Sequence, residues 1–168
     1  GLAGGGTDVS PYCDDFGGAV LNITLNRFAY AFIAPRTDNR LELVSSDLGI
    51  SELIDLDGER RSGTETTLHL GVYERIMREF NNGQPLPLTI TTHADAPAGS
   101  GLGTSSAIVV ALVDAFRAYL DLPLGRYDIA RLAFEIERLE LGLAGGRQDH
   151  YAAAFGGANF IEFLPNDR

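Results

Sequence analysis

The chain has 168 residues, of which 45% are hydrophobic, and a formal net charge of −10. Its length and apolar content suffice for one hydrophobic core, and its single cysteine, Cys13, excludes an intramolecular disulfide or a cysteine-based metal site, which fits a reducing cytoplasm. The negative charge argues against nucleic acid or an anionic membrane as the main partner, and no apolar run reaches the ~18 residues needed for a membrane span.

The N-terminal half contains mostly strand-like patterns. Ala19–Ala34 is rich in β-branched and aromatic residues, which predicts one long bent strand or two paired strands. Leu41–Ser45 and Leu86–His93 predict two further strands. Between them, Thr66–Phe80 has the apolar spacing of an amphipathic helix despite Gly71.

The C-terminal half is mainly helical. Ile108–Leu120 is apolar almost all round, which predicts a buried helix. Arg126–Leu141 predicts a second helix. Its apolar face consists of Ile129, Leu132, Ala133, Ile136 and Leu139. With a last strand at Phe160–Leu164, this order favours an α+β domain with a mixed sheet and helices on one face.

Both ends of the sequence suggest a longer protein. Gly1–Ala3 looks like the tail of a strand, and the turn at Pro165–Asp167 is of a kind that usually leads onward. We therefore expect one domain over residues 1–168, cut at both ends.

The segment Pro97–Ala107, PAGSGLGTSSA, is the most informative stretch of the chain. Its glycines let the backbone turn tightly and approach an anion, and the helix start that follows offers unpaired N–H groups and a positive dipole end. The phosphate-binding candidates are Pro97, Gly99, Ser100, Gly101, Leu102, Gly103, Thr104, Ser105 and Ser106. The pattern matches neither the Walker A loop nor the dinucleotide fingerprint. The alternative interpretation, a glycine-rich turn capped by Ser or Thr, has similar weight from the segment alone.

Two glycine-rich clusters present polar side chains. Gly4-Gly5-Gly6-Thr7-Asp8 could project Asp8 toward ligand hydroxyls, although an ordinary Asp-terminated turn is favoured by the local signal. Later, GLAGGRQDHY presents Arg147, Gln148 and Asp149 before a short helix, or is a plain helix connection. Cys13 is interpreted as a packing residue in a loop.

Isolated charged and histidine residues give weaker signals. Glu137 lies off the centre of its predicted apolar stripe, so a solvated face is the default interpretation. His69, His93 and His150 show no metal-ligand spacing and are interpreted as packing or surface residues, although His150 adjoins a candidate site.

Taken in order, GGGTD, PAGSGLGTSSA, and Glu137 followed by Asp149 in GGRQDHYAAAFGG resemble the N-terminal domain of the GHMP small-molecule kinases. The resemblance covers essentially the whole chain. Within that family, GGGTD with PYC close behind, and AGGRQDHYAAAFGGANFIEF, look most like the D-glycero-D-manno-heptose 7-phosphate kinases. The resemblance implies a ribosomal protein S5 domain 2-like fold and a cytoplasmic enzyme that transfers phosphate from ATP to the anomeric hydroxyl of a sugar phosphate.

The resemblance also implies roles for single residues. The glycine loop and helix start would bind ATP, Ser105 and Glu137 would hold magnesium (Mg²⁺), and Asp149 would orient or deprotonate the sugar hydroxyl. The sugar contacts would come from Gly6, Thr7, Asp8, Arg147, Gln148 and Asp149. Arg147 would bind the substrate's own phosphate or pair with a neighbouring carboxylate.

Two features of the family are missing from these residues. A basic residue on the first strand would lie upstream of Gly1, and a C-terminal domain would follow Arg168, so we expect the fragment by itself to be inactive. Three alternatives remain: a fucose- or galactose-type kinase, a catalytically silent sugar and ATP sensor, and a structural domain without nucleotide.

Overall fold

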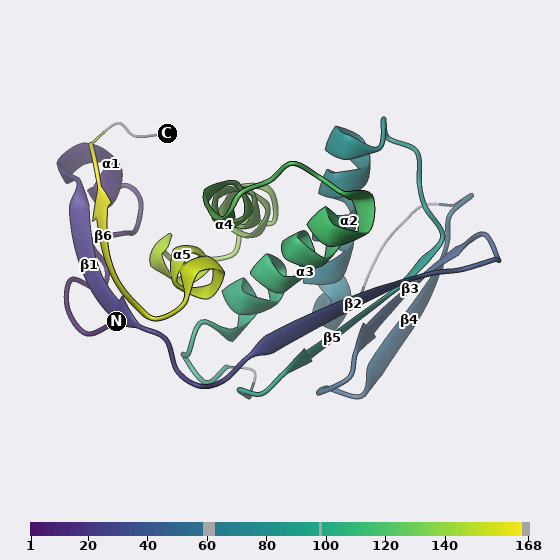
Figure 1. Cartoon of the computed structure of the whole chain (residues 1–168), viewed down its shortest axis with the longest axis horizontal. Coiled ribbons are helices and arrows are strands. Elements are labelled where there is room, and N and C mark those ends of the chain that lie inside the picture. The colour runs from purple at the N-terminus through teal and green to yellow at the C-terminus, as the bar shows by residue number, and fades with distance from the viewer. Residues whose placement is uncertain (59–62, 98, 166–168) are drawn as a thin grey trace.

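The structure is a computed structural model that describes residues 1–58, 63–97 and 99–165. In these ranges the strands form two separate sheets (Figure 1). The strands are β1 (Gly18–Ile23), β2 (Ala29–Pro35), β3 (Arg40–Ser45), β4 (Ile50–Asp55), β5 (Leu88–Ala94) and β6 (Ala158–Phe163). A four-stranded sheet has the order β2-β5-β3-β4, and β1 pairs with β6 in a sheet of two strands. The larger sheet is mixed, because β3 and β5 run parallel and its other pairs are antiparallel.

The helices are α1 (Tyr12–Phe16), a 3₁₀ turn η1 (Thr64–Thr66), α2 (Thr67–Phe80), α3 (Thr104–Leu120), α4 (Arg126–Phe134), a π-helical turn η2 (Glu135–Glu140) and α5 (Gln148–Phe155). Helix α1 packs on the two-stranded sheet, and the other helices lie on one side of the larger sheet (Figure 1). Figure 1 shows α2 and α3 on the sheet, with α4 and α5 between α3 and the small sheet. The predicted α+β class, with a mixed sheet and helices on one face, is confirmed. No helix in the described ranges is long and apolar enough to cross a bilayer.

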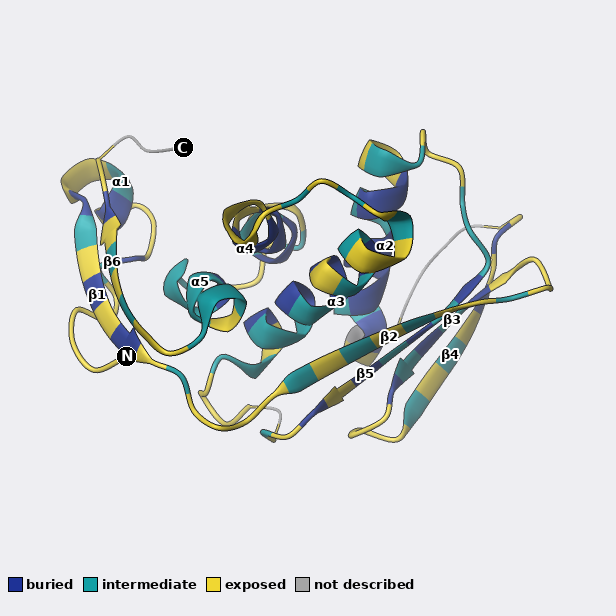
Figure 2. Ribbon diagram, in the orientation of Figure 1, coloured by how far each residue is buried: buried dark blue, intermediate teal, exposed yellow. Residues whose placement is uncertain are grey.

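The main core fills the space between these helices and the sheet. Figure 2 shows the buried sides of α2 and α3 turned toward the sheet. Phe116 on α3 and Tyr73 on α2 are fully buried, and their rings lie 6.4 Å apart. A small second cluster of Cys13, Val20 and Phe163 joins α1 to the two-stranded sheet. Cys13 is thus a packing residue, but it lies in a short helix, not in a loop.

The prediction for Ala19–Ala34 was wrong in its pairing. The segment does form two strands, but β1 pairs with β6 and β2 pairs with β5, so the two belong to different sheets. The Thr24 N–H donates to Gly157 O, which holds the end of β1 beside the C-terminal strand. Local sequence predicts strand formation, but the partner of each strand comes from a distant part of the chain.

Three elements were not predicted: the short helix α1, the 3₁₀ turn η1 and strand β4. β4 forms an antiparallel hairpin with β3, and the intervening residues Ser46–Gly49 (SDLG) end in a glycine at φ +68°. That Asp-Leu-Gly turn before an alternating strand was a usable hairpin signal. The last predicted turn, Pro165–Asp167, lies mostly outside the described residues.

Candidate functional site

The glycine loop leads directly into the N-terminus of α3. Gly99, Gly101 and Gly103 all have positive φ, between +71° and +74°, in agreement with the tight turn predicted from the sequence. Gly103 occupies the N-cap position, and no side chain caps the helix there. The Ser/Thr-capped turn is therefore not what forms. Instead, the first turn of a 17-residue helix keeps N–H groups that have no partner within the helix. Ala98 of this motif lies outside the described residues.

Asp149 packs against this loop from α5. A Cβ placed on Gly103 would lie 3.0 Å from Asp149 Cγ and 3.2 Å from each carboxylate oxygen. The absence of a side chain at Gly103 is therefore what allows the carboxylate so close to the start of α3. Asp149 is itself in the first turn of α5, where the helix dipole favours a negative charge.

Glu137 is fully buried, and this overturns its interpretation as a solvated residue. Ser106 donates to Glu137 Oε2 at 2.8 Å, and His150 Nε2 lies 2.6 Å from the same oxygen. Arg138 Nη1 lies 3.2 Å from the other oxygen, Oε1. Glu137 therefore links α3, η2 and α5 at one point.

These contacts keep Glu137 ionised. Burial alone would raise its pKa, but hydrogen bonds from His150, Ser105 and Ser106 lower the pKa below its ordinary value. A buried carboxylate of this kind has a functional role more often than an exposed one.

The burial of Glu137 has a geometric cause in the π turn. The Leu141 N–H donates to Ile136 O, five residues back, at 3.0 Å. The wider turn changes which residues face inward, so that the consecutive Ile136 and Glu137 are both fully buried. By contrast, Leu139, predicted on the apolar face, is 68% exposed. Because the prediction used a helical period of 3.6 throughout, it misplaced both residues.

Two cavities meet at Asp149. The first, of about 490 Å³, opens between the β3–β4 turn, α2 and the glycine loop. Its lining includes Ser100, Thr104, Ser105, Arg138 and Asp149, together with the apolar Leu48, Leu68 and Ile108. The second, of about 360 Å³, lies beside the first residues of the chain and also contacts Gly103, Gln148 and Asp149. Both volumes are in the range of small-molecule sites.

Asp8 is buried and already hydrogen bonded. Its Oδ2 accepts the Gln148 N–H at 3.0 Å, and its Oδ1 accepts from Gln148 Nε2 and the Gly6 N–H, both at 3.2 Å. Thr7 Oγ1 donates to Gly4 O and Ala19 O. The GGGTD turn thus anchors the residue next to Asp149, and direct contact of Asp8 with a ligand stays a prediction.

Arg147 pairs with a carboxylate in the structure. Its Nη2 lies 3.0 Å from Asp14 Oδ1, and its guanidinium carbon lies 5.1 Å from the centre of the Phe134 ring. This is the second of the two roles considered for Arg147, and it connects α5 to α1.

Sequence reasoning missed the residues that surround Glu137. His150 was interpreted as a packing or surface residue beside a candidate site, and Arg138 was given no role. Both contact the Glu137 carboxylate, and Arg138 Nη2 also donates to Ser106 Oγ at 3.0 Å. The only available signal was that His150 directly follows Asp149. His69, fully buried at the first cavity, binds Thr92 Oγ1 at 2.7 Å.

The residues present are suited to a hard cation shared with a ligand. Glu137 Oε1 is buried and makes no hydrogen bond, and its only close partner among the described residues is the Arg138 guanidinium at 3.2 Å. The exposed Ser105 stands on the first turn of α3, and its hydroxyl hydrogen bonds to the Glu137 carboxylate. No group of three or more His, Cys, Asp or Glu among the described residues could hold a metal ion. One carboxylate, one hydroxyl and the oxygens of a bound phosphate form a set that Mg²⁺ accepts.

Comparisons with known proteins agree with this geometry. The family described as "GHMP kinases N terminal domain" matches residues 67–157. The chain is 44% identical to D-glycero-alpha-D-manno-heptose 7-phosphate kinase of Campylobacter jejuni, over 100% of this chain and 49% of that protein. The chain thus spans about half the length of this relative.

Solved structures give the same result. A D-glycero-D-manno-heptose 1-phosphate kinase from Bacteroides thetaiotaomicron superimposes with a TM-score of 0.92 and 50% identity, over 100% of this chain and 55% of that one. Lactococcus lactis galactokinase superimposes with a TM-score of 0.73 at 19% identity, over 94% of this chain and 44% of that chain, which shows a shared fold.

Proposed function

The chain belongs to the GHMP kinase family, and on that premise we propose that residues 1–168 form the N-terminal, ATP-binding domain of a cytoplasmic sugar kinase. The observation that carries the proposal is the contact between Asp149 and Gly103, which puts a carboxylate at the start of α3 where the two cavities meet.

The first cavity would take ATP. The N–H groups of the glycine loop and of the first turn of α3 would bind its phosphates, because that helix end combines free donors with a positive dipole. The apolar residues Leu48, Leu68 and Ile108, which line the same cavity, are suited to the nucleoside.

Magnesium would be held by Ser105, Glu137 and the phosphates. When bound, the ion neutralises charge on the phosphate oxygens during transfer. Ser106 and His150 both contact Glu137 Oε2, so a cation would bind at Oε1, in place of the ion pair that Arg138 Nη1 makes with this oxygen at 3.2 Å.

Asp149 would act on the acceptor hydroxyl. Its carboxylate accepts a hydrogen bond from that hydroxyl and takes up its proton as the new O–P bond forms and the bond to ADP breaks. Because phosphoryl transfer depends mainly on positioning and charge, the base need not be strong. The turn that Asp8 anchors through Gln148 fixes where this carboxylate stands.

The acceptor we propose is the anomeric hydroxyl of D-glycero-D-manno-heptose 7-phosphate, giving the 1,7-bisphosphate used in nucleotide-heptose synthesis. The 44% identity to a kinase with that name supports this choice. The second cavity, on the other side of Asp149, has the size for a sugar phosphate. Gly6, Thr7, Asp8, Arg147 and Gln148 remain proposed substrate contacts, either direct or through the anchored turn.

The test is an ADP-release assay of the intact protein against a panel of sugars. The panel contains hexoses including galactose and fucose, hexose phosphates, heptoses, and heptose 1- and 7-phosphates. We expect the highest kcat/KM with the heptose 7-phosphate. A preference for unphosphorylated galactose or fucose would contradict the substrate assignment but not the kinase assignment.

Two substitutions test the residue roles. Asp149→Asn should lower kcat by at least ~100-fold with little change in ATP affinity, as expected for loss of a group that acts in the transition state. Glu137→Gln should raise the Mg²⁺ concentration that gives half-maximal rate. Turnover of Asp149→Asn within a few-fold of the parent protein would remove Asp149 from the catalytic role.

A further inference from the structure

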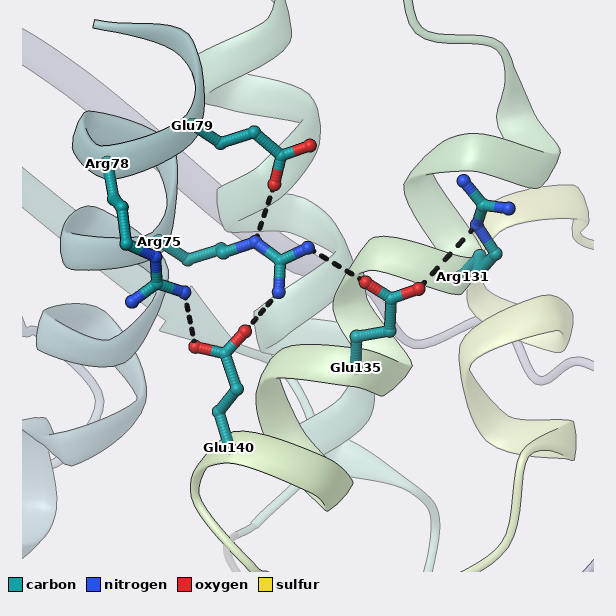
Figure 3. Close-up of polar contacts among 6 residues, drawn as sticks. All are labelled: Arg75, Arg78, Glu79, Arg131, Glu135 and Glu140. Atoms are coloured by element: carbon teal, nitrogen blue, oxygen red, sulfur yellow. Dashed lines mark hydrogen bonds and ion pairs between the residues drawn. The ribbon is translucent and has the colours of Figure 1, made fainter. Parts of the chain in front are cut away.

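One arginine on α2 contacts both ends of the π turn that contains Glu137. Arg75 Nη2 lies 2.9 Å from Glu135 Oε2, and Arg75 Nη1 donates to Glu140 Oε1 (Figure 3). Its Nε lies 2.6 Å from Glu79, one turn along its own helix. The Arg75 side chain is only 19% exposed, so solvent screens these ion pairs less than it would screen exposed ones.

The two bridged carboxylates can meet one guanidinium only in the π register. Glu135 and Glu140 are five residues apart, and in an α-helix residues five apart point about 140° away from each other, given 3.6 residues per turn. In the π turn, whose hydrogen bonds join residues five apart, they face the same side. The contacts of Arg75 therefore favour the π register over the α register.

A second feature of α2 supports the same contact. Gly71 lies one turn before Arg75, in the middle of α2, where glycine is unfavourable. A Cβ at this position would lie 2.9 Å from Leu141 Cδ1, directly after the π turn. The missing side chain thus lets the end of the π turn pack closely on α2.

We propose that Arg75 is a positioning residue, which holds the turn Glu135–Glu140 in the π register and thereby keeps Glu137 pointing into the site. Without the bridge, Glu135 and Glu140 lose the partner that joins them, and the turn is free to adopt α geometry, in which Glu137 lies toward the edge of the buried face. The consequence for catalysis rests on the proposed role of Glu137, but the consequence for the turn does not.

The experiment compares Arg75→Met with Arg78→Met in the intact protein. Arg78 is a matched control, because it also lies on α2 and also contacts Glu140, at 2.8 Å, but is 62% exposed and does not bridge to Glu135. Hydrogen–deuterium exchange of residues 135–143 reports on the turn. The Mg²⁺ requirement and calorimetric binding of Mg·ADP report on Glu137.

We expect exchange in residues 135–143 to become faster in Arg75→Met and to stay unchanged in Arg78→Met, while exchange in β5 is the same in both. The half-maximal Mg²⁺ concentration should rise about tenfold in Arg75→Met, as for loss of a group that orients a metal ligand. Arg75→Lys should resemble Arg75→Met, since an ammonium lacks the planar fork that spans two carboxylates.

The inference is overturned if Arg75→Met matches Arg78→Met in both the exchange and the Mg²⁺ requirement. Glu137→Gln, measured alongside, separates the two proposals: an unchanged Mg²⁺ requirement there removes the role of Glu137, and the exchange data still decide the role of Arg75. If Arg75→Met does not fold, Glu140→Gln takes its place. This variant breaks the bridge to Glu140 but leaves Arg75 paired with Glu79 and Glu135, and the same exchange and Mg²⁺ measurements decide the role of Arg75.

Discussion

Substitution of Gly103 by alanine would disturb the point on which the proposed chemistry depends. Gly103 has φ +74°, and its Cα faces the Asp149 carboxylate. Alanine therefore introduces two separate effects, a strained backbone at the start of α3 and a methyl group 3.0 Å from Asp149 Cγ.

The size of each effect follows from the geometry. An alanine in the left-handed region costs about 1–2 kcal/mol of folding free energy. Relief of the 3.0 Å contact requires Asp149 to move by a few tenths of an ångström. Since a misplacement of ~1 Å can cost ~100-fold in rate, we expect kcat to fall by about tenfold.

Gly101→Ala is the matched control in the same loop. Gly101 has nearly the same φ, +71°, but a Cβ there meets no protein atom within 4 Å. We expect the same loss of unfolding free energy in urea titrations of both variants. We expect kcat to fall only in Gly103→Ala, whereas Gly101→Ala changes KM for ATP.

Equal values of kcat for the two alanine variants would refute this reasoning. The loss at Gly103 would then come from loop strain alone, and the contact with Asp149 would have no part in the rate.

Three further predictions concern stability. Phe116→Ala, which removes a fully buried ring that contacts Tyr73, should lower the unfolding free energy by about 3–5 kcal/mol in urea titrations. Burial lowers the pKa of His69 below 6.5, so as the pH falls the unfolded chain binds a proton at His69 before the folded protein does. The unfolding free energy should therefore decrease as the pH drops below 6.5. An equally steep decrease in a His69→Gln variant would contradict this. The pKa of Glu137 is lowered from 4.5, so its ionised form stabilises the fold above that pH, and the contribution is lost as the pH falls below it. The unfolding free energy of Glu137→Gln should therefore differ less from that of the parent protein in acid than at neutral pH.

Local sequence accounts for much of the fold. Helix α2 was predicted within one residue of its observed start and to its observed end, because its apolar residues recur with helical spacing. The glycine loop was predicted to turn tightly, and its three alternating glycines all adopt positive φ. Both features depend on residues that are close together in the sequence, so they can be predicted without knowledge of the fold.

Other features depend on residues that are far apart in the sequence. The pairing of β1 with β6 joins residues about 140 positions apart, so nothing local to Ala19–Ala34 could reveal it. The role of Gly71 is equally hidden, because the side chain that needs the space is Leu141.

The glycine turn before α3, the α+β class and the order of the motifs can be predicted from the sequence, because each arises from spacing and backbone preference within short segments. The place of Glu137 depends on tertiary contacts. Its burial depends on a π turn bridged by Arg75 from another helix and on partners from α3 and α5. A regular helical period puts this carboxylate at the edge of the apolar face, and contacts between distant segments bring it into the candidate site.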